Sequence, residues 1–147
     1  MKVLIINGPN INLLGRREKT IYGDLSYEEL SENLYAAAKE KDQEIEIFQS
    51  NHEGEIVDRI QSSSGEFGFM IINPGAYTHT SLAIRDALLS VGTPFIEVHI
   101  SNIYGREEFR KHSYISDIAD GVISGFGTDV YFLALEGVQS ILSSQKK

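Results

Sequence analysis

Five short apolar runs alternate with amphipathic segments along this chain, and this alternation constrains the fold more than any other feature. Short runs rich in Val, Ile and Phe are typical of strands, whereas apolar residues three and four apart are typical of helices. Strands that alternate with helices form parallel sheets, because each helix returns the chain to the edge where the strand began. The expected strands are Lys2–Asn7, Gln43–Gln49, Gly68–Asn73, Thr93–Ile100 and Gly121–Ser124.

Helical signals fill the segments between these strands. Ser26 and Glu29 fit a capping box, and apolar spacing continues from Leu30 to about Lys41. Further helices are expected over Glu53–Ser63, Leu82–Val91 and Tyr131–Leu142. Helices on both faces of an open parallel sheet give a three-layer α/β sandwich, and right-handed crossovers favour the flavodoxin-like strand order 2-1-3-4-5. Residues 1–147 are therefore expected to form one domain.

Composition and charge exclude several classes of protein. The formal net charge of the 147 residues is −8, whereas nucleic-acid-binding surfaces are basic. The absence of cysteine excludes disulfides, thiolate metal sites and a cysteine nucleophile. No apolar run has the length of a membrane span, and the start of the chain lacks the pattern of a secretory leader. A cytoplasmic enzyme or binding protein with no nucleic-acid or membrane partner is expected.

Basic residues gather in two places in this acidic chain. Arg16 and Arg17 lie in a long loop, about residues 11–25, of the kind that often forms a lid over a site. Arg106 and Arg110 form the second group. Such groups suggest a small anionic ligand, although solvated surface charge is the alternative for either group alone.

Two of the expected strands end in similar loops. Asn7–Asn10 follows the first strand and Asn73–Tyr77 follows the third, and both combine asparagine, proline and glycine. In the expected strand order these strands are neighbours at the switch point, where open α/β sheets bind ligands. Each loop alone is compatible with an ordinary turn, but together they would flank one crevice.

The fourth strand brings titratable groups to the same edge. Glu97 and His99 are two residues apart, so a strand directs both side chains to one face, and Ser101 follows where the strand gives way to a loop. A histidine held by an acid is a candidate proton donor. The alternative is a histidine that only satisfies a neighbouring carbonyl group.

The segment before the third helix carries another histidine. Thr78 or Thr80 can cap this helix, which leaves His79 near its N-terminus. The helix dipole disfavours an imidazolium ion there, so a neutral, hydrogen-bonding histidine is expected. Asp86 falls on the polar side of the helix and alone indicates a solvated charge.

Two other functions are compatible with such a fold. A flavodoxin-like module that binds flavin or phosphate would need a first loop rich in free N–H groups, and Gly8-Pro9 offers few. A receiver-type signalling domain would need paired acids after the first strand, where Asn7 and Asn10 stand instead.

The quoted motifs together resemble type II 3-dehydroquinate dehydratase. The resemblance is collinear, runs nearly end to end, and rests on these segments: Asn7-Gly8-Pro9-Asn10, Gly15-Arg16-Arg17-Glu18, Tyr22-Gly23, Asn73-Pro74-Gly75-Ala76, Thr78-His79-Thr80-Ser81, Glu97-Val98-His99-Ile100-Ser101-Asn102 and Arg106-Glu107-Glu108-Phe109-Arg110 with His112-Ser113. It implies a single catalytic domain that dehydrates 3-dehydroquinate in the shikimate pathway, without cofactor or metal, as a dodecamer of four trimers.

The resemblance also implies roles for individual residues. Tyr22 would be the base, with Arg17 stabilising its phenolate; His99, supported by Glu97, would protonate the leaving hydroxyl; and Asn10 would stabilise the enolate through a water. Substrate-binding positions of the family correspond to Asn73, His79, Asp86, Ile100, Ser101, Arg110 and Arg106. Among these, Ile100 and Ser101 would act through their backbone N–H groups, and Asp86 would reach a neighbouring subunit's site.

Two segments depart from the family pattern. Tyr104-Gly105 stands where His-Ala is frequent, and Thr128-Asp129-Val130 replaces a segment richer in glycine and glutamine. Both lie outside the implied catalytic set, so the departures concern local packing or subunit contacts rather than the chemistry.

Overall fold

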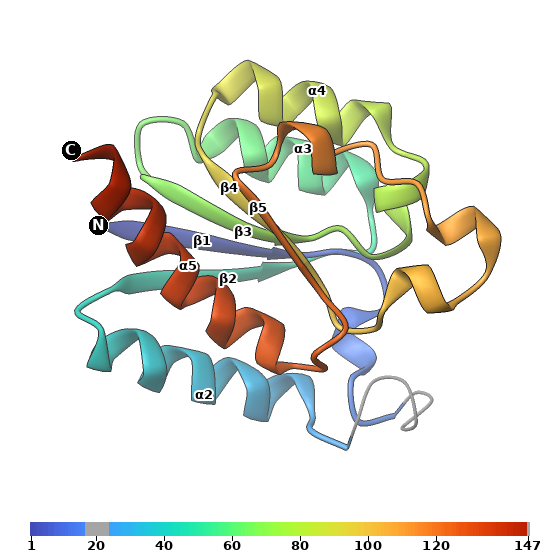
Figure 1. Ribbon diagram of the computed structural model, residues 1–147, viewed down its shortest axis with the longest axis horizontal. Coiled ribbons are helices and arrows are strands. Elements are labelled where there is room, and N and C mark those ends of the chain that lie inside the picture. Colours follow the sequence, from blue (N-terminus) through green and yellow to red (C-terminus); the bar gives the residue numbers. More distant parts are fainter. Residues whose placement is uncertain (17–23, 147) are drawn as a thin grey trace.

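The structure is a computed structural model that describes residues 1–16 and 24–146, and its centre is one parallel sheet (Figure 1). The five strands pair in the order β2-β1-β3-β4-β5, which confirms the predicted topology. Their bounds are β1 (Lys2–Asn7), β2 (Glu44–Gln49), β3 (Phe69–Asn73), β4 (Phe95–His99) and β5 (Gly121–Ser124). All four pairings are parallel, so the carboxyl ends of the strands meet at one edge of the sheet.

Helices cover both faces of this sheet and complete the predicted three layers. In Figure 1, α2 (Tyr27–Glu40) and α5 (Asp129–Gln145) lie on one face, and α3 (Glu53–Ser62) and α4 (Leu82–Val91) lie on the other. Side chains of β1 alternate between the two apolar cores: Val3 and Ile5 pack toward α2 and α5, whereas Leu4 and Ile6 pack toward α3 and α4. Because β1 is central, both of its faces are buried, and its sequence is therefore apolar throughout.

Two helix caps were predicted, of which the structure confirms one and corrects the other. Ser26 Oγ accepts a hydrogen bond from the backbone N–H of Glu29 at 3.1 Å, so α2 begins with the predicted capping box. The predicted cap of α4 was Thr78 or Thr80, but Ser81 caps it instead, through a 3.0 Å bond from the N–H of Ile84. The threonines are excluded because a 3-10 helix, η2 (Gly75–His79), occupies the preceding residues and ends against Thr80.

Several predicted elements are slightly shorter in the structure. The fourth strand begins at Phe95 rather than Thr93 and ends at His99, after which the chain bends at Ile100. This early end matters for the site, because residues beyond His99 leave the ladder and turn along the edge of the sheet.

The segments that depart from the family pattern pack in different ways. Tyr104 lies in the 3-10 helix η3 (Ile103–Gly105) and is exposed. Thr128 precedes the first residue of α5, and Val130 is fully buried in the core between α5 and the sheet. Neither segment disturbs the topology.

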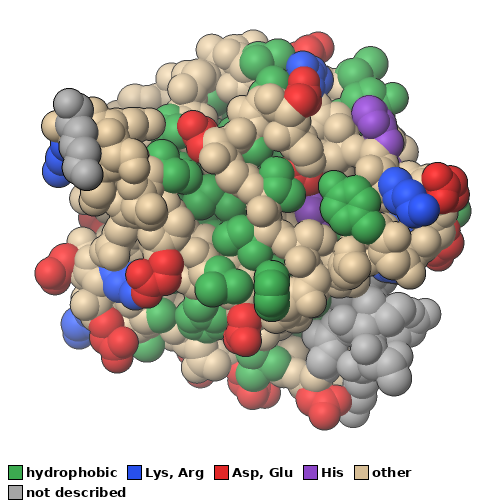
Figure 2. Space-filling view, viewed as in Figure 1, with side chains coloured by type: hydrophobic (Ala, Val, Ile, Leu, Met, Phe, Trp, Pro, Cys, Tyr) green, Lys and Arg blue, Asp and Glu red, His purple; other side chains and the backbone are tan. Residues whose placement is uncertain are grey.

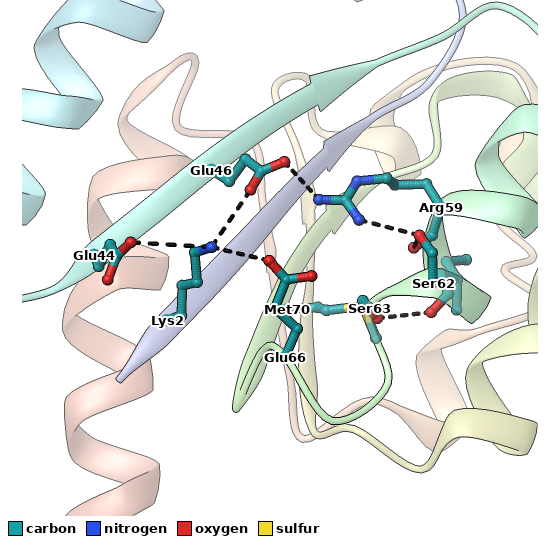
Figure 3. Close-up of polar contacts among 9 residues, drawn as sticks. Lys2, Glu44, Glu46, Arg59, Ser62, Ser63, Glu66 and Met70 are labelled. Atoms are coloured by element: carbon teal, nitrogen blue, oxygen red, sulfur yellow. Dashed lines mark hydrogen bonds and ion pairs between the residues drawn. The ribbon is translucent and has the colours of Figure 1, made fainter.

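A charge network ties the amino-terminal edge of the sheet together (Figure 3). Lys2 Nζ lies 3.0 Å from Glu66, 3.8 Å from Glu46 and 4.0 Å from Glu44. Arg59 of α3 pairs with Glu46 at 2.6 Å. The hydrogen bond to Glu66 is the main reason that the pKa of Lys2 lies above its ordinary value. The network therefore links β1, β2 and α3 at the edge opposite the strand ends discussed below.

A buried phenol joins the carboxyl ends of the two central strands. The hydroxyl of Tyr131, on α5, donates to Asn7 Oδ1 at 2.6 Å and accepts from Asn73 Nδ2 at 2.9 Å. Asn7 and Asn73 are the last residues of β1 and β3 and face each other in the ladder. Complete burial raises the pKa of Tyr131, which keeps the hydroxyl protonated as a donor.

Tyr131→Phe is expected to lower the free energy of unfolding by about 1–3 kcal/mol, because two buried amides lose their shared partner. Denaturant unfolding followed by circular dichroism at a fixed chain concentration measures the change. Tyr35→Phe, in which an exposed tyrosine of α2 loses the same atom, is the matched control. Equal stability of the two variants would contradict the bridging role.

Candidate active site

A polar pocket of about 120 Å³ opens at the carboxyl edge of the sheet. It lies beyond the ends of β1, β3 and β4, where an open α/β sheet binds its ligand. Its walls are formed by Pro9, Asn10, Ile11, Asn73, Gly75, Ala76, His79, His99, Ile100, Ser101, Ile103, Arg106 and Arg110.

The loops after β1 and β3 touch directly, as predicted. The N–H of Gly8 donates to the carbonyl oxygen of Asn73 at 2.8 Å. A Cβ atom at position 8 would lie 2.2 Å from the carbonyl oxygen of Pro74, so only glycine allows this approach. Asn10 follows in the left-handed region, with φ of 69°, at the start of the 3-10 helix η1 (Ile11–Leu13).

Residues after β2 support this wall from behind. Asn51 Oδ1 accepts from the N–H of Asn10 at 3.0 Å and from Gln49 Nε2 at 3.1 Å. The carbonyl oxygen of Asn51 accepts from the hydroxyl of Tyr77 at 2.8 Å. Asn51 therefore connects the Asn10 loop to η2, and its side chain helps to hold Asn10 in its uncommon conformation.

Glu97 and His99 form a buried pair at the end of β4. Glu97 is completely buried and His99 is 5% exposed, and His99 Nε2 is hydrogen-bonded to Glu97 Oε2. Ser116 Oγ donates to Glu97 Oε1 at 2.6 Å, and Ser113 Oγ lies within 3.2 Å of both carboxylate oxygens. Nε2 faces the carboxylate, and among residues 1–16 and 24–146 Nδ1 has no hydrogen-bond partner, so Nδ1 is the ring nitrogen that can serve a ligand in the pocket.

His79 lines the pocket from η2. Its Nδ1 lies 2.7 Å from the carbonyl oxygen of His112, which can only accept, so Nδ1 carries a proton. Desolvation is the main cause that lowers the pKa of His79 below its ordinary value. The ring is therefore neutral at pH 7, and Nε2, which no described residue contacts through a hydrogen bond, can accept one from a ligand. This neutral state was predicted, although the cause assigned to it was a helix dipole.

Two arginines supply positive charge to the pocket. Arg110 Nε donates to Glu107 at 2.7 Å, and Arg106 Nη1 donates to Ser101 Oγ at 3.3 Å. Arg110 belongs to a 3-10 helix, η4 (Glu108–Arg110), and Arg106 precedes this helix; both arginines line the same pocket. Glu107 also lies 3.8 Å from Arg106 Nε and orients both guanidinium groups.

Most of the site residues expected from the sequence meet in this pocket. Eight line it: Asn10, Asn73, His79, His99, Ile100, Ser101, Arg106 and Arg110. Glu97 lies behind His99, whereas Asp86 is exposed on α4 and does not line the pocket. Arg17 and Tyr22 lie outside the described residues.

Sequence reasoning missed the residues that support the pocket walls. Glu107 belongs to the motif Arg106-Glu107-Glu108-Phe109-Arg110. An acidic residue between two arginines was an available signal that it pairs with them. Ser113 was also quoted without a role. Nothing in the sequence pointed to Asn51 or Ser116, because their contacts depend on loops that follow other strands.

Over residues 1–16 and 24–146, no group of three or more His, Cys, Asp or Glu side chains is placed to hold a metal ion. Among the helices of these ranges, none has both the length and the apolar character needed to cross a membrane.

Fold and pocket together define a flavodoxin-like α/β protein with a buried acid–histidine pair and an arginine-lined site for a small anion. Residues 1–139 match the family described as Dehydroquinase class II. A 3-dehydroquinate dehydratase of Prochlorococcus marinus subsp. pastoris is 57% identical over 97% of this chain and 98% of its own length. A catabolic 3-dehydroquinase 2 of Neosartorya fischeri is 55% identical over 97% and 96%.

A solved structure extends the likeness to three dimensions. The crystal structure of a type II dehydroquinase from Butyrivibrio crossotus superposes with a TM-score of 0.92, at 50% identity over 95% of this chain and 97% of the other. The chain belongs to the class II dehydroquinase family. It is a hydro-lyase that converts 3-dehydroquinate to 3-dehydroshikimate. The alternative function, a module that binds flavin or phosphate, is not favoured.

The pKa of His79 predicts how folding stability depends on pH. Because its folded-state pKa lies below 6.5, the unfolded chain binds a proton before the folded chain does as the pH falls. Stability is therefore lost as the pH falls through 6.5. His79→Gln should reduce this loss between pH 7 and 5, and NMR should show His79 titrating below pH 6.5. An equal loss in His79→Gln and in the exposed-loop control His52→Gln would contradict the assignment.

Proposed function

We propose that the dehydration is an anti elimination through an enolate, carried out by residues around this pocket. The substrate has a ketone and a carboxylate, and it loses an α-proton and a β-hydroxyl. The chain must therefore supply a base, an enolate stabiliser, an acid and an anion site. The observation that supports this proposal most is the buried Glu97–His99 pair, whose free ring nitrogen serves a pocket lined by two arginines.

Tyr22 is the proposed base and Arg17 its activating cation. A free phenol has a pKa of about 10, so a neighbouring positive charge is needed to populate the phenolate near neutral pH. Both residues lie in the proposed lid, about residues 11–25, and outside the described residues. The start of that segment supports an anchored lid, because Ile11 and Leu14 are buried in the core.

His99 is the proposed acid. Its imidazolium form donates a proton from Nδ1 to the departing hydroxyl, while Glu97 stabilises the positive ring through Nε2. Asn10 is proposed to hold a water against the enolate oxygen. Its position on the pocket wall supports this role, as does the hydrogen bond from its N–H to Asn51.

The remaining pocket residues are proposed to bind the substrate. The backbone N–H groups of Ile100 and Ser101 hold the carboxylate, because the end of β4 directs the backbone along the pocket. Asn73, His79 and Arg110 bind ring hydroxyls, with the neutral ring of His79 accepting at Nε2. Arg106 is a supporting charge that helps to attract an anion to an otherwise acidic protein.

The reaction needs no bound cofactor or metal in this proposal, because each chemical role falls to a side chain or a water. A cytoplasmic location suits a cysteine-free chain that acts on a small metabolite. The enzyme is proposed to act in the shikimate pathway. A catabolic use is the alternative, because the relative from Neosartorya fischeri is named a catabolic 3-dehydroquinase.

The chain is also proposed to assemble as a dodecamer of four trimers. Figure 2 shows apolar side chains gathered over the face that carries β5 and α5. Val122, Phe126 and Leu133 are 41%, 64% and 44% exposed there, which is unusual for large apolar residues and supports an interface. Asp86, exposed on α4, is proposed to reach the pocket of a neighbouring subunit.

Tyr22→Phe and His99→Gln are expected to block different proton transfers. Both should lower kcat by about 10²–10⁴-fold under metal-free conditions, as judged by the enone absorbance of the product. In deuterium oxide, His99→Gln should still exchange the α-proton of the substrate, because the base remains, whereas Tyr22→Phe should not.

Mass spectrometry of recovered substrate measures this exchange. Unimpaired turnover of either variant would remove that residue from its role, and loss of exchange in both would leave the acid unassigned. Loss of activity in the unmodified chain when a chelator is added would contradict a metal-free reaction.

Light scattering coupled to gel filtration is expected to give a mass of about twelve chains of 16.4 kDa. Phe126→Asp should break this assembly into smaller species, because it places a charge on the exposed apolar face. Phe109→Asp, at a comparably exposed phenylalanine away from β5 and α5, is the control. A monomer at all concentrations would contradict the proposed assembly.

A further inference from the structure

The serines that contact Glu97 come from a segment that the mechanism does not otherwise use. Ser113 and Ser116 follow Arg110, and both are partly buried between the pocket and α4. The segment is fixed at several points. The N–H of Tyr114 donates to the carbonyl oxygen of Thr78 at 2.9 Å, and Arg85 Nη1 donates to the carbonyl oxygen of Tyr114 at 2.7 Å. The serine hydroxyls therefore approach Glu97 from a well-held backbone.

Ser113 can only donate to Glu97. Its Oγ accepts hydrogen bonds from the N–H groups of Ile115 at 3.1 Å and Ser116 at 3.2 Å. A hydroxyl has two acceptor sites and one proton, so both acceptor sites are occupied and the proton is directed elsewhere. The carboxylate oxygens at 3.1 and 3.2 Å are its remaining partners.

Ser116 has the geometry of a strong donor. Its Oγ lies 2.6 Å from Glu97 Oε1, within the range of a hydroxyl bound to an ionised carboxylate. In the described part of the chain, Glu97 thus receives hydrogen bonds from Ser113 and Ser116 and shares a further hydrogen bond with Nε2 of His99. An ionised carboxylate accepts from both serines and from a protonated Nε2, whereas a carboxylic acid would have to donate its proton to Nε2 and would bind the two serine donors more weakly.

We infer that Ser113 and Ser116 are positioning residues that hold Glu97 as an ionised acceptor, so that the transferable proton stays on the His99 ring and not on Glu97. The inference rests on the proposed role of His99 as the acid. It also explains why a carboxylate with no exposure stays charged: three hydrogen bonds replace the lost solvent.

Removing one donor has a definite effect on the pair. With fewer hydrogen bonds, the carboxylate binds a proton more tightly, so the pair as a whole releases its proton at a higher pH. At the same time the proton moves toward Glu97, and less of it is available at Nδ1 of His99. The substitution leaves the other titratable or charged groups around the pocket in place: the neutral ring of His79 and the two guanidinium groups of Arg106 and Arg110.

Ser116→Ala is the primary test, because within the described residues the hydroxyl of Ser116 forms its hydrogen bond with Glu97 alone. Its kcat is expected to fall about tenfold with KM nearly unchanged, as for loss of a hydrogen bond to a charged group. The alkaline limb of the kcat profile should move up by about one pH unit. Ser144→Ala, which removes an exposed hydroxyl on α5 that donates to Ser140, is the control and should change neither.

A matched pair separates the hydroxyl from packing. Ser116→Thr and Ser116→Val have nearly the same shape, and only the threonine keeps a donor. The threonine variant should restore kcat and the pH profile relative to the valine variant. In a Glu97→Gln background, Ser116→Ala should no longer move the alkaline limb, because the carboxylate on which it acts is gone.

Histidine ring NMR distinguishes this inference from the proposed role of His99. With ¹⁵N-labelled histidine and His99→Gln as the assignment standard, the pH midpoint of the His99 resonances should rise in Ser116→Ala. A rise with unchanged kcat would support the serines as positioning residues but remove His99 as the acid. A fall in kcat with neither the limb nor the resonances moved would overturn the inference, since packing alone would explain it.

Discussion

The hydroxyl of Tyr131 is the interaction on which the rest of the carboxyl edge depends. It joins the last residues of β1 and β3, and so fixes the positions at which both strands end and their loops begin. Directly beyond it, the N–H of Gly8 meets the carbonyl oxygen of Asn73, and the two loops become neighbouring walls of one pocket. A helix at the far end of the sequence thus determines the spacing of loops that lie far apart along the chain.

The two edges of the sheet have separate tasks. At the amino-terminal edge, Lys2 and Arg59 pair with acidic side chains and hold β1, β2 and α3 together. At the carboxyl edge, polar groups line a pocket, and several of their partners come from loops, as Ser113 and Asn51 do. This division lets the catalytic edge contain strained or buried polar groups, such as the left-handed Asn10 and the fully buried Glu97, because packing elsewhere supplies stability.

The sequence allowed the topology and most of the pocket to be predicted, for physical reasons. Apolar periodicity indicates which residues are buried, and this pattern locates the strands and the inner faces of the helices. The handedness of the crossovers then favours one strand order. Glu97 and His99 were found because a strand directs residues two apart to one face. The predicted cap of α4 was wrong. Thr78 lies inside the 3-10 helix η2 and Thr80 ends it, so Ser81 is the residue that precedes α4. Asn51 and Ser116 were missed because a supporting contact between two loops leaves no local periodic signal.

The alternation of β4 has a consequence for how this family can change in length. Ile96 and Val98 point into the core beneath α5, while Glu97 and His99 point to the other side and the pocket. A single residue inserted or deleted inside the strand would exchange the two sets, burying the acid pair among apolar side chains and turning Val98 to the pocket. An insertion or deletion of one residue is therefore expected to be tolerated in the connections on either side of β4 but not inside the strand.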